Sequence, residues 1–253
     1  MNIEYVEVRD GSQELSGYLY SAGSKTLVFQ IHGQNGSCRS PHYIRMAEVL
    51  GKQGIDCFLF SVKRKRLSND EVEVTTVSEE TRQAELFVRK LKPRYDKIVV
   101  AGASQAGMTC LELGAKSLVD GIVLIFSVID PGFHVYQKLK RLGITQEELR
   151  KSGGCPYLHY SNDKMIYRAE FFDDFSAQKP LENIKKWTRP ILFMQGTRDS
   201  TIPEKETMQG FDSANEPKKL VHIDSEHKFN EAGAEKIAAE TITWLKENKL
   251  VNE

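Results

Sequence analysis

The sequence has 253 residues, of which 40% are hydrophobic and 28% are charged. Lys and Arg together number 35, as do Asp and Glu, so the formal net charge at pH 7 is zero. This length supports a full hydrophobic core. The balanced charge creates no global field toward nucleic acid or an anionic membrane, so nucleic acid is not an expected partner.

The N-terminal residues and the cysteines indicate the cellular compartment in which we expect the protein. The first residues, MNIEYVEVRDGSQE, include acidic residues and lack the apolar stretch of a secretory signal peptide. No apolar run approaches the roughly 18 residues of a membrane span, so we expect no stable membrane insertion. The four cysteines form no Cys-x-x-Cys pair and fit no metal-binding spacing. We therefore expect reduced thiols in a cytoplasmic protein with no bound metal.

Apolar runs typical of strands recur along the chain, and helical patterns separate most of them. The first two runs alternate in polarity around the turn DGSQ, which predicts a hairpin. The predicted strands are residues 3–8, 14–20, 25–33, 56–62, 97–104, 121–128, 189–197 and 219–225. The predicted helices are residues 40–54, 76–92, a segment after 104 reaching about 118, 203–211 and 232–251. This order predicts an α/β fold: one domain over residues 1–253 with an eight-stranded, mostly parallel sheet and helices on both faces.

The segment 129–188, after the sixth predicted strand, does not fit this alternation. It holds 60 residues, where a single crossover needs about a dozen or more. It also contains the helix-like stretch TQEELRKSG, and a structureless loop of this length is unusual in a compact domain. Its aromatic residues are Phe133, Tyr136, Tyr157, Tyr160, Tyr167, Phe171, Phe172 and Phe175. We expect a small helical cap over the carboxyl ends of the strands.

Ser104 lies in GASQAG, between the strand pattern KIVVA and a helical pattern. Gly102 and Ala106, two residues before and after it, are small, as a tight strand-to-helix turn requires. Such a turn lifts a serine hydroxyl clear of the sheet edge, where it can act as a nucleophile. The alternative is that Ser104 only caps the helix through its hydroxyl.

A serine nucleophile needs a base, and His227 is the best-placed histidine for this role. It follows the last predicted strand, so it lies at the edge where open α/β sheets carry their sites. His222 falls inside that strand, and His134 and His159 lie in the expected cap, where they could line a pocket. The alternative for His227 is an ordinary histidine of a surface loop.

Asp199 is the candidate acceptor that would orient the imidazole of His227. It lies in GTRDSTIP, directly after the predicted strand 189–197. An aspartate in this position holds the tautomer of a catalytic histidine and stabilises its charged form. A simple turn aspartate is the alternative reading.

The oxyanion of a tetrahedral intermediate needs preorganised donors, and two backbone N–H groups are candidates. Gln105, the residue after the candidate nucleophile, would supply one at the start of its helix. The loop HGQNGS after the strand 25–33 would supply the other through Gln34, because Gly33 and Gly36 allow this loop to turn tightly.

Four motifs, HGQNG, GASQAG, GTRDSTIP and DSEHKF, together resemble those of α/β-hydrolase-fold serine hydrolases. The order Ser104, Asp199, His227 is the order of that fold. Over nearly the whole chain, the sequence most resembles compact bacterial carboxylesterases, the cinnamoyl/feruloyl esterase and monoacylglycerol-lipase-like group. The resemblance implies a Ser104–Asp199–His227 triad, an oxyanion hole from Gln34 and Gln105, no cofactor, and a cap that shapes substrate choice.

Two features depart from the resemblance. Ala106 replaces the second glycine of the serine turn, and a methyl is the smallest side chain that could take its place. Many relatives have an aspartate–arginine–glycine loop after the strand 56–62, whereas this chain has four cations, Lys63–Arg66. These cations could attract an anionic substrate at the mouth of the site, or they could form a solvated loop.

The function expected from these residues is hydrolysis of a small carboxylic ester through an acyl-enzyme on Ser104. The aromatic residues of the cap favour an apolar or aryl acyl group, although they could equally form the core of the cap. A thioesterase or an amide or peptide hydrolase would use the same three residues, so these alternatives stay open. A non-catalytic ligand-binding protein of the same fold is the alternative from another class, and the oligomeric state is left open.

Overall fold

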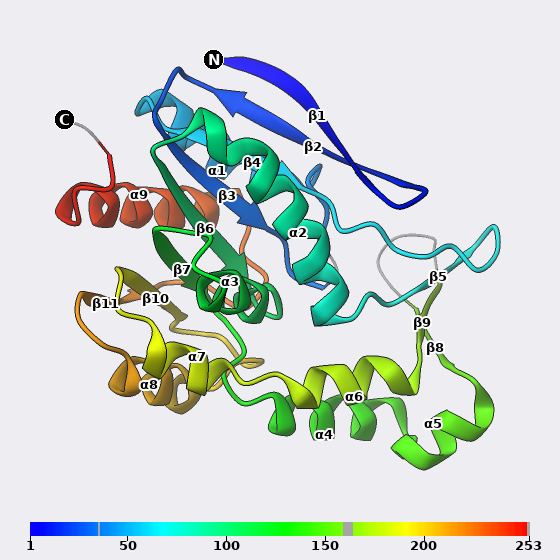
Figure 1. The fold of residues 1–253 in the computed structure, drawn as a ribbon. Coiled ribbons are helices and arrows are strands. Elements are labelled where there is room, and N and C mark those ends of the chain that lie inside the picture. Colours follow the sequence, from blue (N-terminus) through cyan, green and yellow to red (C-terminus); the bar gives the residue numbers. More distant parts are fainter. Residues whose placement is uncertain (35, 159–163, 252–253) are drawn as a thin grey trace.

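A computed structural model describes residues 1–34, 36–158 and 164–251. Its main sheet has eight strands in the order β1-β2-β4-β3-β6-β7-β10-β11 (Figure 1). Their bounds are β1 Asn2–Asp10, β2 Gln13–Ser21, β3 Thr26–Ile31, β4 Asp56–Phe60, β6 Lys97–Ala103, β7 Gly121–Ile125, β10 Ile191–Gly196 and β11 Lys218–Ile223. The β1–β2 and β2–β4 pairs are antiparallel, and all other neighbours are parallel. The predicted fold class and the predicted hairpin are confirmed.

The sheet is covered by helices on both faces because its central strands are apolar on both sides. In β3, Leu27, Phe29 and Ile31 belong to one hydrophobic cluster, and Val28 belongs to another. Since successive side chains of a strand point to opposite faces, one run of apolar residues serves two cores. One core lies against α1 (Pro41–Lys52) and α9 (Glu231–Glu247). The opposite core lies against α2 (Val77–Leu91), α3 (Ala106–Ala115), α7 (Pro180–Lys186) and α8 (Glu204–Ser213).

The segment between β7 and β10 forms an insertion at the carboxyl end of the sheet, drawn below the strands in Figure 1. It contains helices, as predicted, and a hairpin that was not predicted. The insertion contains α4 (Pro131–Leu142), α5 (Gln146–Ser152), β8 (Cys155–Leu158), β9 (Lys164–Tyr167), α6 (Ala169–Ala177) and α7. β9 also pairs with β5 (Glu71–Glu73), which lies in the loop before α2. A segment far away in the chain therefore adds a third strand to this short hairpin. The short 3₁₀ helix η1 (Lys92–Arg94) follows α2.

A third hydrophobic cluster holds the insertion against the sheet domain. It joins Phe171, Phe172 and Phe175 of α6 to Met108 of α3 and Val77 of α2. Most of the aromatic residues named above therefore build the core of the insertion itself. The predicted cap residues His159 and Tyr160 lie outside the described residues.

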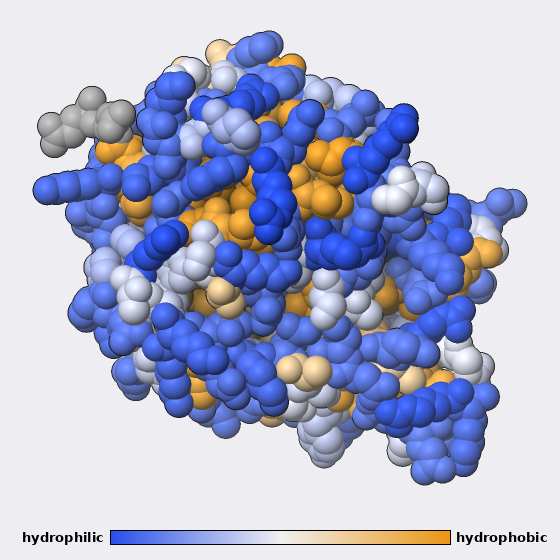
Figure 2. Space-filling view, viewed as in Figure 1, coloured by the Kyte–Doolittle hydropathy of each residue, from blue (hydrophilic) through white to orange (hydrophobic). Residues whose placement is uncertain are grey.

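The surface is mainly hydrophilic on the face that carries α2 and α3, and hydrophobic side chains reach it mostly in its upper half (Figure 2). Within the described ranges, the large hydrophobic side chains that are most exposed are Met1, Ile3, Tyr5 and Tyr136. In the same ranges, no helix is both long enough and apolar enough to cross a bilayer.

Candidate active site

Ser104 occupies the turn between β6 and α3, at the carboxyl end of the sheet. Its φ angle is 57°, in the left-handed region that non-glycine residues rarely adopt. The backbone is held there from two directions. The Ser104 N–H donates to the carbonyl of Ile125 at 2.9 Å, and the Ser104 carbonyl accepts from the N–H groups of Gly107 at 3.1 Å and Val128 at 3.2 Å. Strain of this kind persists only where the surrounding structure imposes it, and it is concentrated at functional sites.

Gly102 is the residue that makes this turn possible. A Cβ atom at position 102 would lie 2.4 Å from the carbonyl oxygen of Ala106 and 2.6 Å from Sγ of Cys110. Both atoms are buried, and one belongs to the backbone, so no side chain fits here. Ala106 is itself fully buried, so its methyl group is accommodated in place of the second glycine.

The structure brings Ser104, His227 and Asp199 into one hydrogen-bonded chain, although each comes from a different loop. Oγ of Ser104 is 3.1 Å from Nε2 of His227, and Nδ1 of His227 is 2.8 Å from Oδ2 of Asp199. The carboxylate can only accept, so Nδ1 carries the proton and Nε2 is free to accept from the serine hydroxyl. The Asp199 side chain is fully buried, and its other oxygen accepts the N–H groups of Thr201 and Ile202.

The other histidines are placed differently. His222 lies within β11, as expected, but its exposed ring pairs with Glu204 at 2.8 Å. His134 on α4 pairs with the buried Glu206, which also accepts the N–H groups of Ile129 and Asp130 at the start of the insertion. Neither ring contacts Ser104, so among the described histidines His227 alone has the geometry of a base for this serine.

The N–H groups of Gln34 and Gln105 are both unengaged within the part of the chain that the structure describes. Each belongs to a peptide whose carbonyl is fixed. The Gly33 carbonyl accepts from the Gly36 N–H at 2.8 Å, and the Ser104 carbonyl is held as described above. In a trans peptide the N–H points away from the carbonyl, so fixing the carbonyl also aims the N–H. Position 33 is adjacent to the serine turn, since a Cβ there would lie 3.3 Å from the Ala103 carbonyl oxygen.

His32 helps to hold this loop, a role that the sequence did not reveal. Its ring is buried; Nδ1 lies 2.8 Å from the Gly33 carbonyl, and Nε2 accepts the Val62 N–H at 3.2 Å. Burial lowers the pKa of His32 to about 4, so the ring is neutral at pH 7 and donates through Nδ1. The clue in the sequence was its place at the end of a mostly apolar strand.

The four cations Lys63–Arg66 do not form one patch. Arg64 turns inward and donates to the Gln34 carbonyl at 2.6 Å. Lys65 pairs with Glu73 at 3.7 Å, and Arg66 donates to the carbonyl of Asn69 at 2.9 Å. The expected attraction of an anionic substrate stays a prediction, and Arg64 is the member of the stretch with described contacts to the loop 32–37.

The insertion also reaches this loop. Oε1 of Gln34 accepts from the ammonium of Lys138 on α4 and from the Tyr167 hydroxyl on β9, the latter at 3.0 Å. The Lys138 ammonium lies 5.0 Å from the ring centre of Tyr167 and 5.2 Å from that of Phe171. Burial lowers the pKa of Lys138 to about 7. Lys138 and Tyr167 could not be placed from the sequence, because more than 100 residues separate them from Gln34.

The described residues contain no cluster of three or more His, Cys, Asp or Glu side chains arranged to hold a metal ion.

Comparisons with known proteins identify the fold. No protein-family profile matches the chain, and no curated protein matches it. Among solved structures, the α/β hydrolase GrgF from Penicillium sp. sh18 superimposes with a TM-score of 0.76 at 15% identity, covering 98% of this chain and 99% of that one. Est1E from Butyrivibrio proteoclasticus gives 0.75 at 16%, covering 96% and 99%. An esterase from Pyrococcus furiosus gives 0.71 at 20%, covering 97% and 91%. The chain therefore has the α/β-hydrolase fold.

Proposed function

We propose that this protein is a serine hydrolase that cleaves a carboxylic ester, with Ser104 as nucleophile, His227 as general base and acid, and Asp199 as the residue that orients His227. The observation that carries the proposal is the unbroken hydrogen-bonded chain from Ser104 through His227 to Asp199. The strained backbone of Ser104 supports it, because a helix-capping serine needs no left-handed φ. Several structures with this fold are esterases, which supports the same reaction class.

In the first half of the reaction, Nε2 of His227 takes the proton of the Ser104 hydroxyl while Oγ bonds to the ester carbonyl carbon. The negative charge moves to the carbonyl oxygen, where the N–H groups of Gln34 and Gln105 receive it. The intermediate then expels the alcohol, which takes its proton from His227, and leaves an acyl group on Ser104.

In the second half, His227 takes a proton from water as the water oxygen attacks the acyl carbon. The second tetrahedral intermediate uses the same two N–H donors. When it collapses, the carboxylic acid leaves and the proton returns to Ser104. Asp199 stays ionised throughout and stabilises the imidazolium that forms twice in each cycle.

We propose a small-molecule ester with an apolar or aryl acyl group as the substrate, and the insertion 129–188 as a cap that shapes its pocket. The aromatic cluster of the insertion supports this, although most of these rings pack against one another. A structure of Est1E with ferulic acid bound, an aryl acid, superimposes on this chain with a TM-score of 0.71. The four cysteines are free thiols, which supports the expected cytoplasmic location.

Hydrolysis of a p-nitrophenyl ester panel, from acetate to long acyl chains and including a cinnamate-type ester, tests the proposal. We expect turnover by the wild type and a loss of several orders of magnitude in kcat for Ser104→Ala and His227→Gln. His222→Gln is the matched control, because His222 also pairs with a carboxylate but does not contact Ser104. A fluorophosphonate probe should label the wild type on Ser104. A folded wild type that neither labels nor hydrolyses any ester would favour the ligand-binding alternative.

A further inference from the structure

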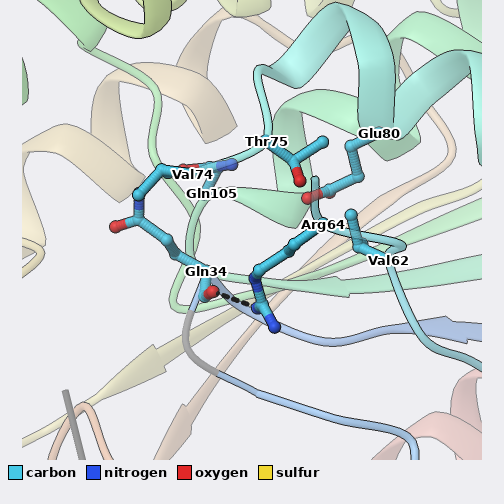
Figure 3. A pocket seen from close by; sticks show the side chains of 7 residues that line it. All are labelled: Gln34, Val62, Arg64, Val74, Thr75, Glu80 and Gln105. Atoms are coloured by element: carbon cyan, nitrogen blue, oxygen red, sulfur yellow. Dashed lines mark hydrogen bonds between the residues drawn. The ribbon is translucent and has the colours of Figure 1, made fainter. Parts of the chain in front are cut away.

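A small polar cavity lies behind the two residues of the proposed oxyanion hole (Figure 3). Its volume is about 10 Å³, which is enough for about one water molecule and too small for any substrate group. The lining residues are Gln34, Val62, Arg64, Val74, Thr75, Glu80 and Gln105.

Arg64 connects this cavity to the loop of the first donor. Its guanidinium donates to the Gln34 carbonyl at 2.6 Å and to the Gly36 carbonyl at 3.4 Å, and Figure 3 shows the first of these bonds. The Gly33 carbonyl on the preceding peptide is already bonded to Gly36 and His32. The peptide before Gln34 is thus fixed by the bonds to the Gly33 carbonyl, and the peptide after Gln34 is fixed by the bond from Arg64.

Glu80 connects the same cavity to the second donor. Its carboxylate is buried between α2 and α3, accepts the Thr109 hydroxyl at 2.7 Å, and lines the cavity together with the Gln105 side chain. Burial raises the pKa of Glu80 to about 7, and the nearby charge of Arg64 acts in the opposite direction. A buried carboxylate is costly unless it is compensated, so the attraction to Arg64 and the bond to Thr109 offset its desolvation.

We propose that Arg64 and Glu80 are positioning residues that hold Gln34 and Gln105, and hence the two N–H donors, in the geometry of the oxyanion hole. This inference rests on the proposed serine hydrolase function. Arg64 acts from the loop after β4 and Glu80 from α2. Their mutual attraction across the cavity thus fixes the position of one donor relative to the other. An oxyanion exists only in the transition state and the intermediates, so loss of this brace should lower kcat and leave KM almost unchanged.

The experiment compares Arg64→Met, Arg64→Lys, Glu80→Ala and Glu80→Gln with the control Arg66→Met. Arg66 belongs to the same cationic stretch, but its guanidinium donates to the carbonyls of Ser68 and Asn69 in its own loop. The readouts are kcat and KM for a p-nitrophenyl ester, and the rate at which a fluorophosphonate labels Ser104. Thermal unfolding confirms that each variant is folded.

We expect Arg64→Met to lower kcat and the labelling rate about 10- to 100-fold with KM within about threefold, since removal of a whole oxyanion donor costs about 100- to 1,000-fold. Arg64→Lys keeps a positively charged donor group without the planar guanidinium, so its kcat should be at least about threefold higher than that of Arg64→Met. Glu80→Ala should lower kcat more than Glu80→Gln, which retains a hydrogen-bonding group of the same size. Arg66→Met should match the wild type within about twofold.

The proposal is overturned if folded Arg64→Met keeps the wild-type kcat within twofold, if its loss lies entirely in KM, or if Arg66→Met loses as much. If Arg64→Met does not fold, the two Glu80 variants test the proposal instead. Equal kcat values for Glu80→Ala, Glu80→Gln and the wild type would then overturn the proposal. A wild type that labels and turns over while these variants are unaffected overturns this inference alone. A folded wild type that neither labels nor turns over overturns the proposed function, and this inference falls with it.

Discussion

The hydroxyl of Thr109 donates to Oε1 of Glu80 at 2.7 Å, and both side chains are buried between α2 and α3. This bond satisfies one oxygen of a carboxyl group that has lost its contact with water. Burial nevertheless raises the pKa of Glu80 to about 7, so ionisation of this carboxyl group costs more in the folded protein than in the unfolded chain. The pair therefore makes the stability of the fold depend on pH.

Glu80→Gln should raise the melting temperature at pH 8 and change it much less at pH 5. The folded pKa of Glu80 lies above its value of about 4.5 in the unfolded chain. Its contribution is thus most favourable below pH 4.5 and is lost as the pH rises toward and through 7. The neutral amide of glutamine does not have this cost. Thermal unfolding of both proteins at the two pH values measures the difference, and an equal shift at pH 5 and pH 8 would contradict this account.

Asp199→Asn should lower kcat by about 1,000- to 10,000-fold with little change in melting temperature. The Thr201 and Ile202 N–H groups need an acceptor, so the asparagine oxygen should face them. Its NH₂ group then faces Nδ1 of His227, which forces the ring proton onto Nε2 and removes the acceptor for Ser104. Ester hydrolysis and thermal unfolding measure the two effects. A kcat within tenfold of the wild type would show that Asp199 does not set the tautomer.

Gly102→Ala should destabilise the protein by about 1–3 kcal/mol or prevent it from folding. The added methyl would meet the Ala106 carbonyl oxygen at 2.4 Å, and the serine turn would have to open. Gly132→Ala on α4 is the matched control, because its Cβ would have only an ordinary contact, 3.5 Å from Oδ1 of Asp130. Urea unfolding compares the two variants. Equal stabilities would mean that the turn is looser than its geometry indicates.

The ring of His32 should stay neutral down to about pH 5 in the folded protein. Its folded pKa of about 4 lies below the ordinary value of 6.5, so the unfolded chain takes up the proton first as the pH falls. The stability linked to His32 is full above pH 6.5 and decreases toward pH 4, by roughly 3 kcal/mol in all. Histidine ¹H–¹³C NMR titration measures the pKa directly. A midpoint near 6.5 in folded protein would rule out the buried, neutral ring.

The fold could be predicted from the sequence because each central strand is a run of apolar residues and each is followed by a helical pattern. The placement of Ser104, Asp199 and His227 followed from the same regularity, since each lies in the loop that follows a strand. The hairpin β8–β9 could not be predicted, because its third strand, β5, lies far away in the chain. Glu80 and Lys138 were missed as members of the site, and Arg64 was considered only as part of a cationic stretch at its mouth. Their roles come from burial and from contacts between distant segments, which no local pattern encodes.

Gln34 connects the loop beside Ser104 to the insertion between β7 and β10. Its backbone N–H is the donor that we propose for the oxyanion, while its side chain is bonded to Lys138 and Tyr167 of the insertion. If the insertion selects the substrate, then any exchange of this segment also alters a contact of the loop that carries the proposed oxyanion donor. Selectivity and turnover should therefore change together in evolution and in engineering. A transplanted insertion that lacks counterparts of Lys138 and Tyr167 should bring a new substrate range together with a slower enzyme.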